Sequence, residues 1–502
     1  MSPKYVAPLL IVYGLALASS AAEPVGDAWW PQFRGPNASG IAESGEYPVV
    51  FGRSNYLLWK TPLPPGVSSP CVWGHRIFVT CFDAERKKLE VVCIDRGDGK
   101  ILWRQTAPTE KIEKFHPAGS PVSSTPVTDG ERVYVYFGSY GLLCFDMEGN
   151  ELWNKPMPIP ITQWGTGTSP VLAADKLILI RDQYSGWGAE KRSAYVLALD
   201  PKDGTTIWKT ERPAEPSWST PIVRPIGGSE ELVVFGRKRL IAYDLRDGAE
   251  RWRVDGLPLD AVGVPVTGSG LIFVAGTEIG GDPERPIAIP AFADIVKRFD
   301  KDKDGKISQN EAPRQISLDP RTRSGAEVMS LHSWFWQVDK DKDGLASREE
   351  WIEASEVTSK RFTKYRDAAV AIRPGGSGDV TETHVAWRVS RGVPDSPSPL
   401  YHEDRLYLVK TGGIVSCLDA KTGEQRFRSR LGSGGPYSSS PVVANSNVYI
   451  ASERGVIVVF KAGDKPEVLA KNDLGERIMA TPAFVDGKIY VRTDEHLYAF
   501  GK

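Results

Sequence analysis

Residues 125–136 read Thr-Pro-Val-Thr-Asp-Gly-Glu-Arg-Val-Tyr-Val-Tyr, and they open a unit that recurs along the chain. The unit begins with Ser or Thr, Pro and an apolar residue, and continues through two short runs rich in β-branched and aromatic residues. It ends in Asp, a turn and Trp. This copy reaches Trp153, and two others run from Pro170 to Trp208 and from Pro221 to Trp252. Such runs, separated by Gly, Asp and Pro, predict short antiparallel strands.

Eight starts of the unit lie along the chain. They are Pro70, Pro126, Pro170, Pro221, Pro265, Pro399, Pro441 and Pro482. Successive starts are 41 to 56 residues apart, except for one interval of 134. Removing roughly 85 residues, 281–365, restores the usual spacing, so this segment is an insertion in the fifth unit. Repeated units of four short strands are typical of propeller blades.

The last unit lacks its fourth strand. Its three β-rich runs, 483–484, 488–492 and 496–500, are not followed by a run with Trp, whereas Tyr56-Leu-Leu-Trp59-Lys-Thr61 precedes the first unit. A strand from this stretch would complete the last blade and remove the free edges of the ring. We therefore predict an all-β fold, an eight-bladed β-propeller closed by an N-terminal strand. Residues 23–280 and 366–502 form the propeller, and a small α-helical EF-hand pair, 281–365, is inserted in blade five.

An aromatic residue ends most units. These residues are Trp59, Trp103, Trp153, Trp208, Trp252, Trp387 and, once, Phe427. Because they recur once per unit, we interpret them as packing wedges between neighbouring blades rather than as ligand platforms.

The five cysteines are too few and too scattered for a disulfide scaffold. Cys93, Cys144 and Cys417 occupy the same place in three units, which predicts equivalent buried strand positions. Cys71 and Cys81 lie on neighbouring predicted strands, and the sequence leaves open whether they pair.

The unit Ser/Thr-Pro…Asp-x-x-Asp-Gly-x-x-x-Trp resembles the pyrroloquinoline-quinone-like (PQQ-like) repeat of eight-bladed propellers. In addition, Trp30-Pro-Gln-Phe-Arg34-Gly-Pro36 is similar to the opening of exported bacterial propellers of this group that lack an assigned activity. The resemblance implies the fold; it does not imply the quinone, because non-enzymatic members share the repeat.

The quinone dehydrogenases of this fold hold PQQ in the central channel beneath a disulfide between adjacent cysteines. This sequence has no adjacent cysteines, no Cys-x-x-Cys-His haem motif, no Gly-x-Ser-x-Gly elbow and no Walker-type loop. The sequence therefore favours a non-enzymatic binding or scaffold protein, and a quinone-dependent alcohol or sugar dehydrogenase is the alternative. A scaffold resembling the outer-membrane assembly propeller is a third reading, but no cysteine follows the N-terminal apolar run to carry a lipid.

Two twelve-residue loops lie in the insertion, at 300–311 and 339–350. Each has carboxylates at positions 1, 3, 5 and 12, Gly at position 6 and Ser at position 9, which is the ligand spacing of an EF-hand calcium site. Position 7 would contribute its backbone carbonyl, and position 9 would act through water. The predicted ligands of two calcium ions are Asp300, Asp302, Asp304, Lys306, Ser308 and Glu311, and Asp339, Asp341, Asp343, Leu345, Ser347 and Glu350.

The segments before the loops are amphipathic. Apolar residues at helical spacing are Phe292, Ile295, Val296 and Phe299 in the first segment, and Val328, Leu331, Phe335 and Val338 in the second. Helices with these faces would share one small core. Since calcium is abundant outside the cell, we expect the sites to stay filled and to serve a structural role.

Connections between units carry the candidate ligand-binding residues of the propeller. These residues are His116, Trp164, Trp218, Tyr437 and Arg477. In a propeller such connections gather on one face around the channel, and the turn between the second and third strands, where the insertion falls, lies on the same face. The alternative is that these aromatic residues only cap the blades.

The N-terminus predicts export. Lys4, an apolar run over 6–18 and the small residues Ser20, Ala21 and Ala22 are typical of a cleaved signal peptide, 1–22, with an uncleaved anchor as the alternative. We expect a periplasmic or extracellular, monomeric protein without a membrane span. The formal net charge of -1 and the dispersed charges give no reason to expect a nucleic acid or an anionic membrane as partner. The expected partner is a protein or a glycan.

Overall fold

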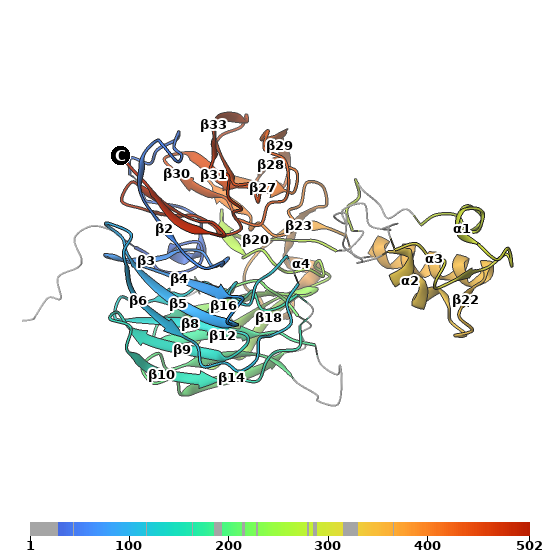
Figure 1. The fold of residues 1–502 in the computed structure, drawn as a ribbon, viewed down its shortest axis with the longest axis horizontal. Coiled ribbons are helices and arrows are strands. Elements are labelled where there is room, and N and C mark those ends of the chain that lie inside the picture. Colours follow the sequence, from blue (N-terminus) through green and yellow to red (C-terminus); the bar gives the residue numbers. More distant parts are fainter. Residues whose placement is uncertain are drawn as a thin grey trace, which may run out of the picture.

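The computed structural model describes residues 29–43, 45–116, 118–162, 164–184, 193–212, 216–226, 229–278, 281–284, 289–314, 330–364 and 366–502. These residues form a ring of eight antiparallel sheets, with a helical element to the right of the ring in Figure 1. The predicted signal peptide lies outside the described residues.

Blades one to four follow one another along the chain, and their strands pair in sequence order. Blade one contains β3 (Cys71–Trp73), β4 (Arg76–Asp83), β5 (Lys88–Asp95) and β6 (Ile101–Thr106). Blade two contains β7 (Val127–Thr128), β8 (Arg132–Phe137), β9 (Gly141–Asp146) and β10 (Glu151–Pro156). Blade three contains β11 (Val171–Ala173), β12 (Lys176–Arg181), β13 (Ala194–Leu199) and β14 (Thr206–Arg212). Blade four contains β15 (Ile222–Ile226), β16 (Ser229–Gly236), β17 (Arg239–Asp244) and β18 (Glu250–Asp255).

Blades five to eight repeat this arrangement. Blade five contains β19 (Val266–Gly268), β20 (Leu271–Gly276), β23 (Ala368–Ile372) and β25 (Val385–Val389). Blade six contains β26 (Leu400–His402), β27 (Arg405–Lys410), β28 (Ile414–Asp419) and β29 (Gln425–Arg430). Blade seven contains β30 (Val442–Ala444), β31 (Asn447–Ala451), β32 (Val456–Lys461) and β33 (Glu467–Asp473). Blade eight contains β34 (Ala483–Val485), β35 (Lys488–Arg492), β36 (His496–Phe500) and β2 (Leu57–Pro62).

The N-terminal strand β2 closes the ring. It pairs antiparallel with β36, from Leu57 opposite Phe500 to Pro62 opposite His496. The predicted eight-bladed propeller and its closing strand are therefore confirmed.

Hydroxyl groups link the inner ends of neighbouring blades. In seven of the eight blades, the backbone N–H of the residue before the blade's Pro donates to the hydroxyl of the equivalent residue in the next blade, at 2.9–3.0 Å. The links are Ser69 to Thr125, Thr125 to Ser169, Ser169 to Thr220, Val264 to Ser398, Ser398 to Ser440, Ser440 to Thr481, and Thr481 to Ser69. Blades four and five lack this link because valine at position 264 has no hydroxyl.

The tryptophans of the outer strands dock on the next blade. Trp103 Nε1 donates to Met147 O at 3.0 Å, and the ring lies against Gly149, where a Cβ would come within 2.7 Å of it. The same contact joins Trp59 to Gly99, Trp153 to Gly204, Trp208 to Gly248 and Trp387 to Gly423. These contacts confirm the packing role. Trp252 differs, because its Nε1 donates to Glu231 Oε1 within its own blade, at 3.1 Å.

Substitutions at Gly248 and Gly256 would distinguish the effect of losing the tryptophan contact from the strain of the left-handed turn. Both have left-handed φ angles, +74° and +72°, but a Cβ at Gly248 would lie 2.4 Å from the ring of Trp208, whereas one at Gly256 would meet nothing within 4 Å. We expect Gly256→Ala to lower the free energy of unfolding by about 1 kcal/mol through backbone strain. Gly248→Ala should lower it by about 2–4 kcal/mol, because the ring must also move. Denaturant unfolding followed by circular dichroism measures both losses, and equal losses would contradict the wedge interpretation.

The equivalent cysteines face these aromatic residues. Cys93, Cys144 and Cys417 are fully buried and lie opposite Trp103, Trp153 and Phe427 in their sheets. This confirms that they occupy equivalent strand positions. All five cysteines of the chain are buried free thiols, so Cys71 and Cys81 are not paired.

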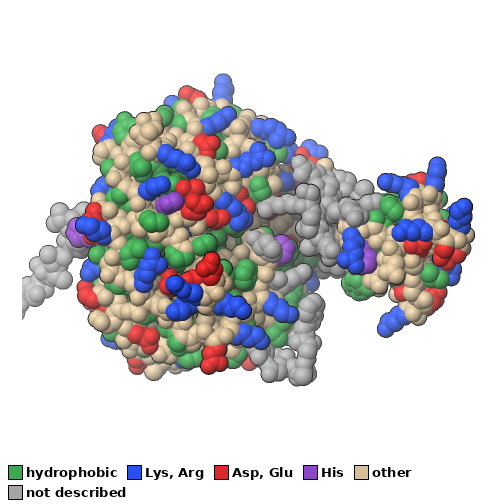
Figure 2. Space-filling view, viewed as in Figure 1, with side chains coloured by type: hydrophobic (Ala, Val, Ile, Leu, Met, Phe, Trp, Pro, Cys, Tyr) green, Lys and Arg blue, Asp and Glu red, His purple; other side chains and the backbone are tan. Residues whose placement is uncertain are grey.

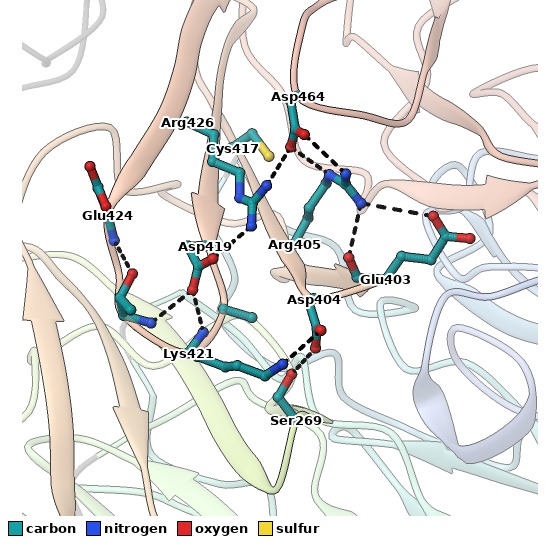
Figure 3. A network of polar contacts seen from close by, with 12 residues as sticks. Ser269, Glu403, Asp404, Arg405, Cys417, Asp419, Lys421, Glu424, Arg426 and Asp464 are labelled. Carbon is teal, nitrogen blue, oxygen red and sulfur yellow. Dashed lines mark hydrogen bonds and ion pairs between the residues drawn. The ribbon is translucent and has the colours of Figure 1, made fainter.

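Blade six carries Phe427 at the place of the recurring tryptophan, and a phenylalanine has no N–H to donate to the next blade. Ion pairs join blades six and seven here (Figure 3). Asp464, in the turn after β32 of blade seven, accepts from Arg405 Nε at 2.8 Å and from Arg426 Nη1 at 2.7 Å. The two guanidinium groups lower the pKa of Asp464 to about 2. Because these side chains are partly exposed, the ion pairs contribute little to the free energy of unfolding. They mainly fix how blades six and seven lie against each other.

The N-terminal segment 29–43 enters the ring. The strand β1 (Trp29–Trp30) pairs with β3, the inner strand of blade one, and the short helix η1 (Pro36–Ala38) follows. Further contacts reach the inner strands of other blades: the N–H of Thr128 donates to Pro31 O at 3.0 Å, and the N–H of Ala42 donates to Val443 O at 2.9 Å. A segment that contacts several inner strands lies in the central channel.

The helical insertion leaves blade five between its second and third strands. β20 pairs directly with β23, from Ile272 opposite Ile372 to Gly276 opposite Ala368, and residues 277–367 lie between them in sequence. The helices are α1 (Phe292–Phe299), α2 (Leu331–Val338) and α3 (Arg348–Lys364), and β21 (Ile307–Ser308) pairs with β22 (Leu345–Ala346). A further short helix, α4 (Thr381–His384), and β24 (Gly378–Asp379) belong to the turn before β25, and β24 extends blade four.

The visible surface is mixed in charge. Figure 2 shows acidic and basic side chains interspersed over both the propeller and the helical element. Of the helices in the described residues, none has the length and apolar character needed to cross a membrane.

Candidate functional site

The helices of the insertion enclose a small aromatic core. Trp334 on α2 and Trp351 on α3 are almost fully buried, and their rings meet edge to face with centroids 5.1 Å apart. Their indole N–H groups donate to Thr358 Oγ1 and to Pro290 O, at 3.1 and 3.0 Å. Because both N–H groups are satisfied, this core fixes the two helices that flank the second acidic loop.

The predicted apolar faces are partly present in this core. Ile295, Leu331, Trp334, Phe335, Val338 and Trp351 are buried in it, and Phe292, Val296 and Phe299 pack against it. Trp336 points away, with 71% of its surface exposed. Val328 lies outside the described residues.

The last carboxylate of each acidic loop is held in the same way. Glu311 Oε2 accepts from the N–H and the hydroxyl of Ser308, at 2.9 and 2.8 Å. Glu350 Oε2 accepts from the same two groups of Ser347, at the same distances. Position 12 is therefore anchored to position 9 in both loops.

The backbone bends identically in the two loops. Gly305 and Gly344 at position 6 have φ angles of 79° and 86°, which a residue with a Cβ rarely adopts. Ile307 pairs with Ala346 between the loops, and both side chains are fully buried. The short pairing aligns the two loops side by side.

Three carboxylates converge in each loop. Ligand oxygens of Asp300, Asp302 and Glu311 lie within 4.8 Å of one another, and so do those of Asp339, Asp341 and Glu350. Asp304 and Asp343, at position 5, are not part of these groups of three. Clustered carboxylate oxygens are the ligands that calcium prefers.

Two features of the loops are compatible with cation binding. Asp339 Oδ1 is buried without a hydrogen-bond partner among the described residues, although Oδ2 of the same group accepts from the N–H of Gly344 at 3.1 Å. In the first loop, the N–H of Asp304 lowers the pKa of Asp302, but burial and the neighbouring carboxylates outweigh it and raise that pKa. A cation among the carboxylates would supply a partner and relieve the repulsion.

Two ion pairs fasten the base of the insertion to blade six. Lys410 Nζ on β27 lies 2.5 Å from Asp282 Oδ2, and both side chains are at least 94% buried. Arg428 on β29 makes a two-pronged contact with Glu284, at 2.5 and 2.7 Å. Sequence reasoning missed these residues, because the partners are 128 and 144 positions apart and carry no motif.

The structure brings together three of the five predicted ligand-face residues. The rings of His116 and Trp164 lie 4.1 Å apart, and Trp218 Nε1 donates to the adjoining Gly165 O at 2.8 Å, so these three aromatic residues form one group. Tyr437 is 1% exposed and donates to Ser433 O at 2.8 Å. Arg477 forms ion pairs with Glu453 and Asp494.

A buried acid lies close to the aromatic group. Glu113 is 3% exposed, and its Oε2 accepts from Thr166 Oγ1 at 2.6 Å. Gly138 leaves room for it, because a Cβ there would come within 2.6 Å of both carboxyl oxygens. Burial raises the pKa of Glu113 to about 7, although the bond from Thr166 works against this rise.

Glu113 makes the stability of the propeller pH-dependent. The folded chain holds this proton up to about pH 7, whereas the unfolded chain releases it near pH 4.5, so the folded state loses stability as pH rises between these values. We expect Glu113→Gln to remove on the order of 3 kcal/mol of this loss between pH 5 and pH 8. Thermal unfolding at both values measures the difference. Glu110→Gln, at an exposed position three residues away, should leave the pH profile unchanged, and an unchanged profile for Glu113→Gln would contradict the prediction.

Comparisons with known proteins agree on the fold. A family model described as outer membrane protein assembly factor BamB matches residues 51–188, 192–284, 377–465 and 413–502, which is well over half of the chain. No curated protein matches the sequence.

Among solved structures, BamB from Moraxella catarrhalis is 11% identical over 89% of this chain and 99% of that chain, with a TM-score of 0.51. The quinohemoprotein alcohol dehydrogenase from Comamonas testosteroni is 13% identical over 94% of this chain and 80% of that chain, with a TM-score of 0.54. The computationally designed protein Ika8 is 8% identical over 89% of this chain and 100% of that chain, with a TM-score of 0.50. At these identities the structures share the fold with this chain, and the fold occurs both in the assembly factor BamB and in an alcohol dehydrogenase.

Proposed function

The chain belongs to the family of the outer membrane protein assembly factor BamB, and from this premise we propose that it is an exported, non-enzymatic binding protein. In this proposal residues 1–22 are a signal peptide, and residues 281–365 form an EF-hand domain that binds two calcium ions. The propeller binds a protein or a glycan on the face from which that domain leaves the ring. The description of the family as an assembly factor supports a protein as the partner.

The matched pair of acidic loops carries the calcium proposal. Each loop brings three carboxylates within 4.8 Å, and the two loops are joined through β21 and β22. Calcium takes six to eight oxygen ligands at flexible geometry, which the carboxylates, one backbone carbonyl and water would supply. A smaller ion such as magnesium prefers fewer protein carboxylates and retains more water.

Calcium would hold the insertion in shape rather than switch it. Without an ion the carboxylates repel one another, and the core around Trp334 and Trp351 is too small to offset much repulsion. The propeller is held by its own blade interfaces and should not depend on the ion.

Calorimetric titration of the chelator-treated full chain tests the proposal. We expect two calcium ions to bind per chain, and Glu311→Gln or Glu350→Gln to weaken one of the two sites at least about tenfold, because each removes a bidentate charged ligand. Glu356→Gln, on the exposed side of α3 where the carboxylate pairs with Lys360, is the matched control and should keep both sites. Fewer than two sites in the unmodified chain, or no loss in both variants, would contradict the proposal.

Limited proteolysis tests the structural role. Cleavage between residues 285 and 365 should be faster in chelator, whereas the unfolding transition of the propeller should stay the same. Equal cleavage rates with and without calcium would show that the ions do not stabilise the insertion.

The residues present do not fit a quinone in the channel. There is no pair of adjacent cysteines, the five thiols are buried singly on separate strands, and the N-terminal segment occupies part of the channel. These features support the binding protein over the dehydrogenase. Mixing the purified chain with quinone and calcium should therefore give neither a shifted absorbance nor dye-linked oxidation of alcohols, and either signal would favour the enzyme.

A further inference from the structure

A glycine-rich connection joins blades six and seven. Residues 432–435 read Gly-Ser-Gly-Gly, and the first and third of them are exposed. Two of their carbonyl groups are bound: Ser433 O accepts from the hydroxyl of Tyr437, and Gly435 O accepts from the N–H of Gly412, both at 2.8 Å. By contrast, the N–H groups of residues 432–435 have no acceptor within the described part of the chain. The connection therefore has donors to offer a ligand.

Three exposed cationic side chains border the connection. Lys471 Nζ on β33 lies over its first glycine, in the space that a Cβ would fill, and Arg454 Nη1 lies 3.6 Å from where a Cβ on Gly434 would be. Arg430 Nη1 lies 3.9 Å from the corresponding position at Gly412. Among the described residues, none of these three cations has an ion-pair partner. Cations and backbone N–H groups that both lack an acceptor are typical of a site for oxyanions.

The acidic groups nearby are held by other cations. Glu453, beside Arg454 in the chain, pairs with Arg477 at 2.9 Å. Glu284 of the insertion is held by both nitrogens of the Arg428 fork. Because these carboxylates are engaged elsewhere, charge complementarity at the connection favours a negatively charged partner.

The equivalent connection, between blades seven and eight, has the opposite charge. Leu431 and Leu474 align the two connections, because each donates its N–H to a glycine carbonyl of the adjoining turn, at 2.7 and 2.9 Å. Where the first connection has Arg430, the second has Asp473, whose Oδ1 accepts from the N–H of Gly475 at 2.8 Å. The acid satisfies this N–H within the chain, whereas the arginine leaves the equivalent N–H to a ligand.

The connection lies on the face from which the insertion leaves the ring. Gly412 belongs to the turn between the second and third strands of blade six, and the insertion leaves blade five from the equivalent turn. Arg428, which holds Glu284 of the insertion, lies two residues before Arg430 on β29. A partner bound at the connection would therefore lie beside the base of the insertion.

We propose that this connection, together with Arg430, Arg454 and Lys471, binds an acidic segment of a protein partner. The three cations lie over different residues of the connection rather than around one point. Carboxylates spaced along a chain therefore match them better than a single phosphate does. The exposed N–H groups of the connection would donate to the same carboxylates. This assignment rests on the proposed function, in which a protein binds this face, and it adds the charge of the segment that binds.

Fluorescence anisotropy on the full chain tests the site. The probe is a short rhodamine-labelled peptide of alternating glutamate and serine, and the same peptide with glutamine in place of glutamate is the neutral probe. We expect the acidic peptide to bind with a dissociation constant on the order of 100 µM in about 50 mM salt. Binding should weaken at least about tenfold in about 300 mM salt, because salt screens exposed charges.

Charge variants make the result specific. Lys471→Gln and Arg454→Gln should each weaken binding about two- to fivefold. Arg430→Asp, which copies the connection between blades seven and eight, should weaken it at least about tenfold, because it replaces an attraction by a repulsion. Lys461→Gln is the matched control: it removes one exposed positive charge at the far end of β32 from Arg454 and should leave binding unchanged.

Four outcomes would overturn the assignment. They are no binding of the acidic peptide at about 1 mM, equal binding of the neutral peptide, an equal loss in Lys461→Gln and Lys471→Gln, and displacement of the peptide by about 10 mM phosphate at constant ionic strength. An acidic oligosaccharide that binds where the peptide does not would move the assignment to a glycan and overturn it as well. A negative result would remove only the charge of the partner's segment. The proposed function is decided separately, by the calcium titration.

Discussion

We expect Trp30→Ala to lower the free energy of unfolding of the propeller by about 3–5 kcal/mol, the usual loss when a buried tryptophan is truncated. Trp30 is 1% exposed inside the channel, where it packs near Phe484 of blade eight and under Gly35. The loss combines the transfer of the ring from water with the cavity that remains. Because β1 joins blade one while Trp30 reaches blade eight, this side chain spans the site at which the ring closes.

The neighbouring tryptophan is the matched control. Trp29 lies in the same two-residue strand but is 41% exposed, so Trp29→Ala should cost about 1 kcal/mol or less. Denaturant unfolding followed by far-ultraviolet circular dichroism measures both variants. Similar losses for the two residues would show that the N-terminal segment does not stabilise the channel through Trp30.

Lys410→Met should lower the free energy of unfolding by about 3–5 kcal/mol, because it leaves the Asp282 carboxylate buried without its ammonium partner. The two charged atoms are 2.5 Å apart, and neither side chain is more than 6% exposed. Asp282→Asn in the Lys410→Met background removes the remaining charge, so the double variant should recover a large part of the loss.

An exposed ion pair in the same blade provides a comparison for the effect of burial on the coupling energy. Lys421 Nζ lies 2.8 Å from Asp404 Oδ2, but the two side chains are 59% and 48% exposed, so Lys421→Met should destabilise the protein far less than Lys410→Met. A complete double-mutant cycle on each pair measures the coupling energies by denaturant unfolding. A coupling at Lys410 and Asp282 no larger than at Lys421 and Asp404 would contradict the prediction.

The fold could be predicted from the sequence because the blades repeat. Residues such as Thr125, Cys144 and Trp153 recur at fixed places, and each makes the same local contact in the structure, so their spacing determines the number of blades and the position of the insertion. The stretch around Trp59 is identifiable as the closing strand because the last unit lacks a fourth strand.

Other residues could not be placed from the sequence, because their contacts do not repeat from blade to blade. Trp30 and Arg34 belong to a segment without strand or helix periodicity, so nothing in the sequence placed them inside the ring. Arg34 is fully buried and donates to Pro399 O across 365 positions. Glu113 gave no signal either, because its burial depends on Gly138 and Thr166 from other loops. Only the two acidic loops carry their chemistry in contiguous residues.

The junction between blades four and five limits how modular the ring is. It lacks the hydroxyl link, since position 264 is valine, and the indole N–H of Trp252 donates within its own blade rather than to the next one. Instead, β24 from blade five pairs with β18 of blade four, and Thr381 Oγ1 accepts from the N–H of Asp255 at 2.8 Å. Blades one to three each make the same hydroxyl link and the same tryptophan contact with the next blade. They could therefore be exchanged or duplicated as interchangeable modules. Blades four and five could only be moved together, as one double module.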